Sequence, residues 1–183
     1  MEFVSSLNTI LAVLTIAGQA IVVLVVVALA TQRILPLSNT FLALVGKFAF
    51  PVAFATAIMA TIFSLVYSEI IGYEPCKLCW FQRIFIYPQV ILLGLAWYRK
   101  EWILSLYSVV LSVMGGTIAL YQYLLSFGIV PSLPCAAGNE GVSCNQIFVV
   151  EFGYITIPLM SLSGFLLILA VFAARRATAN THV

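Results

Sequence analysis

The chain has 183 residues, of which 63% are hydrophobic and only 8% are charged, and its formal net charge at pH 7 is +2. Soluble domains carry about 25% charged residues, so the composition excludes an ordinary soluble protein. The small net charge and the lack of a basic stripe also argue against nucleic-acid binding, and we predict a polytopic protein of the lipid bilayer with an all-α fold.

Five apolar stretches are long enough to cross a bilayer, which takes about 20 helical residues. In chain order they cover residues 8–31, 48–70, 80–98, 102–126 and 154–174. The first stretch contains a small-x-small pattern at 28–30 that is also typical of signal-peptide cleavage. Only Glu2 precedes this stretch and cationic residues follow it, which favours a retained helix with its N-terminus outside.

The charges between the spans predict the orientation of the chain. Short cationic loops stay in the cytoplasm, and Lys and Arg gather at residues 32–47, 99–101 and 175–176. By alternation, the breaks at 71–79 and 127–153 face outward. All four cysteines of the chain lie in these two outward breaks, where thiols can be held oxidised.

The first cysteine pair, Cys76 and Cys79, forms a Cys-x-x-Cys motif suited to dithiol–disulfide exchange. Apolar sequence resumes directly after it, so we expect Cys79 at a helix N-terminus, where a thiolate is favoured. Arg83 follows one turn later, and an Arg within a span indicates function, although an Arg that snorkels to the interface would also fit. A zinc site would need further ligands, and the only histidine, His182, lies in the inward tail, so we predict no metal.

The second pair, Cys135 and Cys144, lies in an irregular loop with two prolines and several glycines. These cysteines could form a static disulfide that closes the loop. They could also form an accessible redox pair that exchanges with the first one. The loop sequence alone leaves both alternatives open.

Electrons released by these thiols need an acceptor in or near the membrane. The sequence has no haem-attachment motif and no dinucleotide fingerprint. A quinone dissolved in the bilayer needs only an apolar slot and a donor to its carbonyl oxygens. Arg83, together with Gln82 or Gln122, could supply that donor.

The chain resembles the DsbB family of quinone-coupled, disulfide-generating membrane proteins, most closely its BdbC-like branch. The resemblance rests on Glu74-Pro-Cys-Lys-Leu-Cys-Trp-Phe-Gln-Arg83, on Cys135 and Cys144, and on the segment 153–158. It covers roughly residues 46–174. It implies a four-helix thiol oxidase core at 46–176, preceded by an additional transmembrane helix and inner loop at 1–45 and followed by a cytoplasmic tail at 177–183.

The resemblance also implies roles. Cys79 would face ubiquinone or menaquinone beside Arg83, Cys135 would meet an extracytoplasmic thioredoxin-like oxidase of the DsbA or BdbD type, and Cys144 would exchange with Cys76. The expected function is a quinone-dependent oxidoreductase of a prokaryotic cytoplasmic membrane, which reoxidises that disulfide donor with its cysteines on the outer face.

Three features depart from the family pattern. The first span is additional, only eight residues separate Cys135 from Cys144, and Gln122 stands where some members have a His. In the vitamin K epoxide reductase family the loop cysteines precede the Cys-x-x-Cys, which is the reverse of the order here. Two other functions remain open: a structural membrane module with stapled loops, and a reductive relay, which would need cysteines that can be reached from the cytoplasm.

Overall fold

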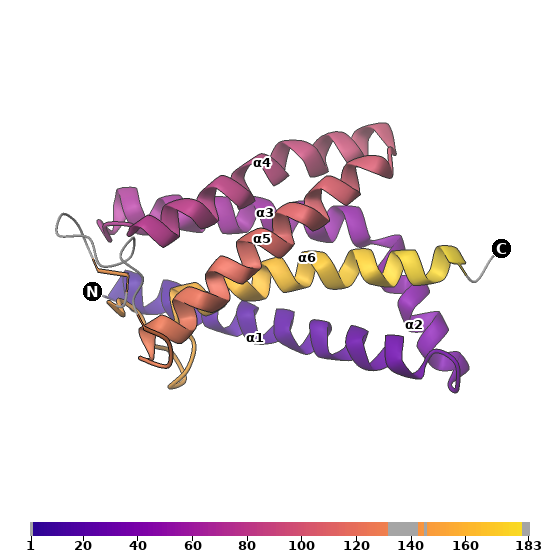
Figure 1. The fold of residues 1–183 in the computed structure, drawn as a ribbon, viewed down its shortest axis with the longest axis horizontal. Coiled ribbons are helices and arrows are strands. Elements are labelled where there is room, and N and C mark those ends of the chain that lie inside the picture. Colours follow the sequence, from indigo (N-terminus) through magenta and orange to yellow (C-terminus); the bar gives the residue numbers. More distant parts are fainter. Residues whose placement is uncertain (1, 132–142, 145, 181–183) are drawn as a thin grey trace.

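The computed structural model describes residues 2–131, 143–144 and 146–180, and no strand occurs among them. The helices are α1 (Glu2–Thr31), α2 (Pro36–Lys47), α3 (Ala49–Leu65), α4 (Lys77–Arg99), α5 (Ile103–Ser126) and α6 (Ile157–Asn180) (Figure 1). A five-residue π-helix, η1 (Val66–Ile70), directly continues α3. The predicted all-α fold is confirmed for the described residues.

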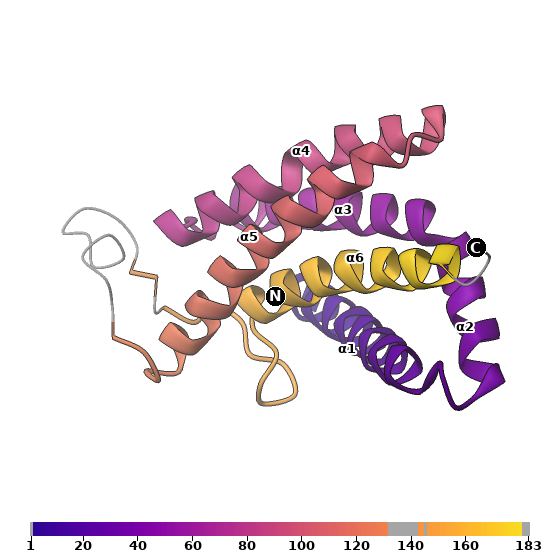
Figure 2. The ribbon, with the colours of Figure 1, turned by 45° about the vertical axis from the view of Figure 1, so that its right-hand side comes forward.

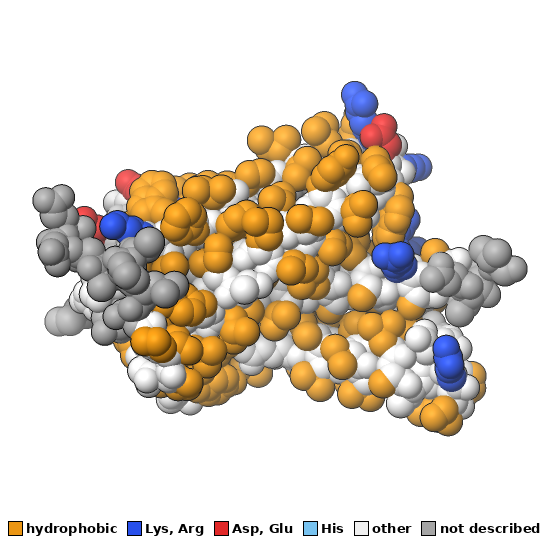
Figure 3. Space-filling view, in the orientation of Figure 1, with side chains coloured by type: hydrophobic (Ala, Val, Ile, Leu, Met, Phe, Trp, Pro, Cys, Tyr) orange, Lys and Arg blue, Asp and Glu red, His pale blue; other side chains and the backbone are white. Residues whose placement is uncertain are grey.

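Five helical segments are long and apolar enough to cross a membrane, and each has between 22 and 28 residues. They are Val4–Thr31, Ala49–Ile70, Lys77–Arg99, Ile103–Ser126 and Ile157–Ala179. Hydrophobic side chains cover the visible face along the length of the bundle, while Lys and Arg gather mainly at the end that carries α2 (Figure 3). The five predicted spans are therefore confirmed, with ends shifted by a few residues.

The segment expected to be an inner loop, residues 32–47, instead contains helix α2. Pro36 is the first residue of this helix, a position where a backbone N–H has no acceptor within the helix, so the missing N–H of proline costs no hydrogen bond. Three of its residues are buried at four-residue spacing: Ser38, Leu42 and Gly46. A Cβ atom on Gly46 would lie 2.9 Å from the Cα atom of Arg175 in α6. The helix thus forms against a surface that α6 supplies.

Helices α3 to α6 form a four-helix bundle in which α4 and α6 each pack against both α3 and α5. Helix α1 lies along α6 and also touches α2, and in Figure 1 it lies on the side of α6 away from α4 (Figures 1 and 2). The Cys-x-x-Cys end of α4 lies at the opposite end of the bundle from α2 (Figure 1).

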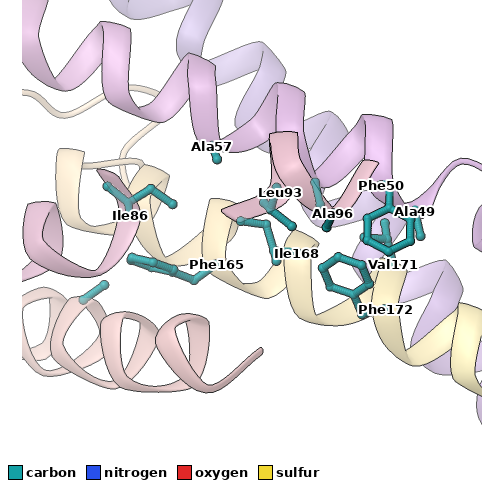
Figure 4. Packing of buried hydrophobic residues seen from close by; sticks show 12 residues of the cluster. Ala49, Phe50, Ala57, Ile86, Leu93, Ala96, Phe165, Ile168, Val171 and Phe172 are labelled. Atoms are coloured by element: carbon teal, nitrogen blue, oxygen red, sulfur yellow. The ribbon is translucent and has the colours of Figure 1, made fainter. Parts of the chain in front are cut away.

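The core of the bundle combines small and aromatic side chains (Figure 4). Its buried members are Ala49, Phe50, Ala53, Ala57, Ile86, Leu93, Ala96, Ala119, Phe165, Ile168, Val171 and Phe172. Small residues let helices approach closely in lipid, where packing rather than the hydrophobic effect holds them together. The closest approach is at Gly115 of α5, where a Cβ atom would overlap the buried ring of Phe165.

The side chain of Gln89 in α4 is completely buried within the bundle, as are those of Ser108 and Ser112 in α5. Its Oε1 accepts hydrogen bonds from Ser108 Oγ (2.6 Å) and Ser112 Oγ (3.1 Å) of α5. Its Nε2 donates to the Phe85 carbonyl oxygen at 3.0 Å. A buried amide is tolerated when it is paired in this way, so Gln89 joins α4 to α5 and needs no further role.

Candidate active site

The Cys-x-x-Cys motif lies at the start of α4. Cys76 is the N-cap residue, with an extended backbone (φ −70°, ψ 171°), and its carbonyl oxygen accepts a hydrogen bond from the Trp80 amide at 3.1 Å. Because α4 begins at Lys77, Cys79 lies in the first turn of the helix. The free N–H groups and the dipole of such a turn favour a thiolate. The predicted position of Cys79 at a helix N-terminus is confirmed.

Three cysteines meet at this end of the bundle as free thiols. The Sγ atom of Cys76 donates to the Sγ atom of Cys79 at 3.4 Å. Cys144 is buried and packs with Cys76 and Leu125 in one cluster. The hydrogen bond with Cys79, the burial of the thiol and the neighbouring Cys144 raise the pKa of Cys76 above its usual value.

The fourth predicted site cysteine, Cys135, lies outside the described residues.

Gln122 of α5 reaches both sulfurs of the motif. Its Nε2 atom lies 3.3 Å from Cys79 Sγ and 3.4 Å from Cys76 Sγ. Its Oε1 accepts a hydrogen bond from Nε2 of Gln82, one turn after the motif. Both glutamines are buried. The Cys79 thiol also donates to Oε1 of Gln122 at 3.8 Å, so the Gln122 amide contacts this sulfur through both of its polar atoms. Its NH₂ group can stabilise negative charge on the sulfurs.

Arg83 is buried between α4 and α3, with 7% of its surface exposed. Its Nε donates to Ser64 Oγ at 3.0 Å and its Nη2 donates to the Ser64 carbonyl oxygen at 2.8 Å. The guanidinium carbon lies 5.0 Å from the centre of the Trp80 ring. This side chain is held inside the protein, so the alternative of an Arg that snorkels to the interface does not describe it.

A cavity of about 470 Å³ lies beside Cys79 and Arg83. Small-molecule and cofactor sites span roughly 300–1,000 Å³ and combine apolar walls with a few polar groups. Side chains such as Val52, Met59, Ile86 and Leu167 form apolar walls. Polar side chains line the cavity near the motif and also along it, and they include Ser64, Tyr67, Glu74, Gln82 and Gln122 as well as Thr15, Thr56 and Ser163. The cavity has the size and the polarity of a site for a largely apolar ligand.

A second, smaller cavity of about 40 Å³ lies on the side of the loop that carries Cys144. Cys76, Cys79, Cys144 and Gln122 line it, as does Thr156 just before α6. Cys79 and Gln122 line both cavities. Cys79 therefore lies between the side that carries Cys144 and the large apolar cavity.

The structure adds site residues that the sequence did not suggest. Ser64 holds Arg83 from 19 positions away, and the only hint was a polar residue in an apolar span. Thr156 is buried, and its Oγ1 atom has no hydrogen-bond partner among the described residues. No spacing rule links either residue to the cysteine motif.

Comparison with known proteins agrees with this arrangement. The model of the family described as disulfide bond formation protein DsbB matches residues 46–175. The chain belongs to the DsbB family. The match begins near α3, so the DsbB-like part is the four-helix bundle, and α1 and most of α2 lie before it.

Several named relatives cover most of the chain. It is similar to "Probable disulfide formation protein C 1" of Bacillus anthracis, with 38% identity over 122 residues, which are 67% of this chain and 87% of the relative. It is also similar to the SPbeta prophage-derived disulfide bond formation protein B of Bacillus subtilis, with 37% identity over 142 residues, 75% of this chain and 95% of the relative. No solved structure matches the chain.

Membership of the DsbB family, with five apolar spans, makes this a multi-pass membrane protein of disulfide bond formation. Its general chemistry is thiol–disulfide oxidation.

Proposed function

We propose that this DsbB-family protein is a quinone-dependent thiol oxidase, which reoxidises an extracytoplasmic thioredoxin-like disulfide donor. The observation that carries the proposal is the position of Cys79 between two cavities. One cavity is shared with Cys76 and Cys144, and the other is apolar and shared with Arg83. This arrangement suits a sulfur that receives electrons from one side and releases them on the other.

The first half of the reaction is thiol–disulfide exchange. A reduced partner of the DsbA or BdbD type attacks the Cys135–Cys144 disulfide at Cys135, so that a partner disulfide forms and the loop pair becomes a dithiol. Cys144 then attacks the Cys76–Cys79 disulfide at Cys76 and releases the Cys79 thiol. Cys135 attacks Cys144 in the resulting Cys144–Cys76 mixed disulfide, which restores the loop disulfide and leaves Cys76 and Cys79 as a dithiol. In each exchange one S–S bond forms as another breaks, and the leaving sulfur takes up a proton. The buried contact between Cys76 and Cys144 supports the second exchange.

A bound quinone supplies the acceptor for the two electrons and two protons that the Cys76–Cys79 dithiol then gives up. The residues present fit such a group, because the cavity is apolar over most of its wall and polar beside Cys79. Ubiquinone and menaquinone both meet these requirements.

The polar end of the cavity can hold and orient the acceptor. A guanidinium has five N–H donors, and Ser64 accepts from only two nitrogens of Arg83, so Arg83 keeps donors for a carbonyl oxygen. Gln122 donates to the Cys79 sulfur and Gln82 fixes the amide of Gln122. We assign Arg83 to the quinone and the two glutamines to the thiolate of Cys79.

The same proposal sets the orientation in a prokaryotic cytoplasmic membrane. Six of the eight cationic residues lie away from the cysteines, just after α1, at the ends of α2 and α4 and in the last turns of α6, whereas Lys77 and Arg83 lie at the cysteine end. By the positive-inside rule the end that carries these six residues and the C-terminus are cytoplasmic. The N-terminus and the four cysteines then lie outside, where an oxidising environment suits disulfide chemistry.

The experiment is quinone reduction by purified protein on addition of a reduced thioredoxin-like substrate, followed by the absorbance of the quinone. We expect one quinol per partner disulfide formed, and no reduction with Cys79→Ser. A protein with merely stapled loops would leave both substrates unchanged, and a reductive relay would instead deliver electrons to an oxidised partner.

A further inference from the structure

Helix α1 lies before the part of the chain that matches the DsbB family, yet it forms part of the large cavity. Leu11, Leu14, Thr15 and Gly18 contribute to the lining. These positions recur every three or four residues, so they share one face of α1. The family's four-helix core would leave this side of the cavity without a protein wall.

Helix α1 is fixed to the core by two polar contacts. Tyr67 Oη, in the π-helix η1, donates to Asn8 Oδ1 at 2.7 Å, and Gln19 Nε2 donates to Ser163 Oγ at 3.0 Å. Asn8 and Tyr67 are both buried. Interhelical hydrogen bonds stabilise helix association in lipid, so the two contacts fix both the rotation and the height of α1 beside α6.

The cavity lies between α1 and α3, which do not pack closely against each other. Among the described residues, α1 packs along α6 but has no comparable packing with α3. Leu14 of α1 and Met59 of α3 line the cavity and are 51% and 41% exposed, respectively. The cavity is therefore open toward the surrounding lipid between these two helices, at some distance along the membrane normal from the cysteine motif.

We propose that α1 is the outer wall of the binding site for the isoprenoid chain of the quinone. This inference rests on the proposed function, which places the quinone ring beside Cys79 and Arg83. The chain of the quinone then runs from the ring along the apolar face of α1 and leaves between α1 and α3. The cavity is continuous from Cys79 to Gly18, and its wall toward α1 is apolar apart from Thr15, whose hydroxyl donates to its own helix at 2.8 Å.

Gly18 offers a direct test. A Cβ atom there would meet only Leu167 Cδ2, at 3.8 Å, so the helix backbone tolerates a side chain and a longer one extends into the cavity. We expect Gly18→Leu to raise the KM for a long-chain quinone about tenfold. The KM for a quinone with the same ring and no chain, and the KM for the thiol partner, should stay within about twofold.

The matched control is Ala17→Leu, which adds the same side chain to the neighbouring, exposed position outside the cavity lining. This variant should leave the KM values for both quinones unchanged. If Gly18→Leu does not fold, Leu14→Ala provides a second test, because it removes part of a lining side chain instead of adding one. It should weaken the binding of the long-chain quinone and leave the binding of the quinone without a chain unchanged. Equal effects on quinones with and without the chain would overturn the proposal.

A second readout does not depend on turnover. A quinone that carries a photoreactive group in its isoprenoid chain should label residues 11–18 of α1 in the wild-type protein, and this labelling should be lost in Gly18→Leu. Label confined to α4 and α5, with normal quinone reduction, would refute the role of α1 but leave the proposed function intact. No quinone reduction at all would refute the proposed function.

A displacement experiment distinguishes a bound quinone chain from a bound phospholipid acyl chain, which is also a long apolar chain. Excess long-chain quinone should displace any phospholipid that copurifies with the protein, as measured by native mass spectrometry. Phospholipid that is retained in the presence of quinone, and lost only in Gly18→Leu, would identify a lipid site and overturn the proposal.

Discussion

Ser64 holds Arg83 through two hydrogen bonds, from Nε to the Ser64 hydroxyl at 3.0 Å and from Nη2 to the Ser64 carbonyl oxygen at 2.8 Å. A hydroxyl and a carbonyl of one residue thus bind two sides of the guanidinium. The charge is fixed in the wall of the large cavity, on the same helix as Cys79 and one turn away. A planar group held in this way can orient a carbonyl ligand, whereas a flexible cation could only attract it.

The first prediction concerns this charge. Arg83→Gln should weaken the apparent affinity for quinone by about one to two orders of magnitude, because a hydrogen bond from a charged donor contributes roughly 1.5–3 kcal/mol. Arg83→Lys should restore only part of the loss, since an ammonium lacks the planar fork. Steady-state kinetics in each substrate separately provide the measurement. If the quinone KM of Arg83→Gln equals that of the wild type, Arg83 has only a structural role.

The second prediction concerns the motif itself. Cys76→Ser and Cys79→Ser should each abolish turnover, because neither variant can form the disulfide that accepts electrons from the loop. Both should remain folded in membranes, since helix packing in lipid does not depend on a disulfide at the end of the bundle. Turnover and thermal unfolding are measured on the same preparations. Wild-type rates in either variant would remove the motif from the mechanism.

A third prediction follows from the contact between Cys76 and Cys144. In the double variant Cys79→Ser with Cys135→Ser these two are the only cysteines, and mild oxidation should join them. Intact-mass analysis after alkylation detects the bond. The matched variant that keeps Cys79 and Cys144 should oxidise more slowly, because Cys144 is buried in one cluster with Cys76, whereas Cys79 packs at the edge of that cluster. The reverse order of rates would mean that exchange enters the motif at Cys79.

The fourth prediction tests the orientation. Thiol probes that cannot cross the membrane should label the reduced cysteines of intact cells from outside only. The reason is the position of the cationic residues at the other end of the bundle. A single cysteine introduced at the C-terminal tail of a cysteine-free variant serves as control and should react only after permeabilisation. Labelling of the native cysteines from the cytoplasmic side would support the reductive relay instead.

The fifth prediction concerns stability. Gly115→Ala places a methyl group against the ring of Phe165, which is only 1% exposed and cannot move freely. Overpacking of this kind costs about 1–3 kcal/mol, so the melting temperature should fall. Gly116→Ala is the matched control, because its Cβ atom would lie 3.5 Å from Phe165 Cβ, an ordinary contact. Similar melting temperatures for the two variants would contradict the packing described here.

Features that depend on neighbouring residues could be predicted from the sequence. The five spans follow from runs of about 20 apolar residues, and the position of Cys79 in the first turn of α4 follows from the resumption of apolar sequence after the motif. The resemblance to the DsbB family rested on short motifs and is confirmed by the family match. The sequence did not indicate that the inner break at 32–47 contains helix α2, whose buried side packs against both α1 and α6.

Contacts between distant residues were decided by the tertiary structure alone. Gln122 reaches Cys79 across 43 positions, Ser64 reaches Arg83 across 19, and α1 supplies a wall to a cavity of the other helices. The physical reason is that the faces of these helices toward lipid and toward protein are both apolar. In a water-soluble protein, hydrophobic periodicity reveals the buried face of a helix. In this protein it does not show which helices are neighbours, because the arrangement of the helices depends on the close packing of particular side chains.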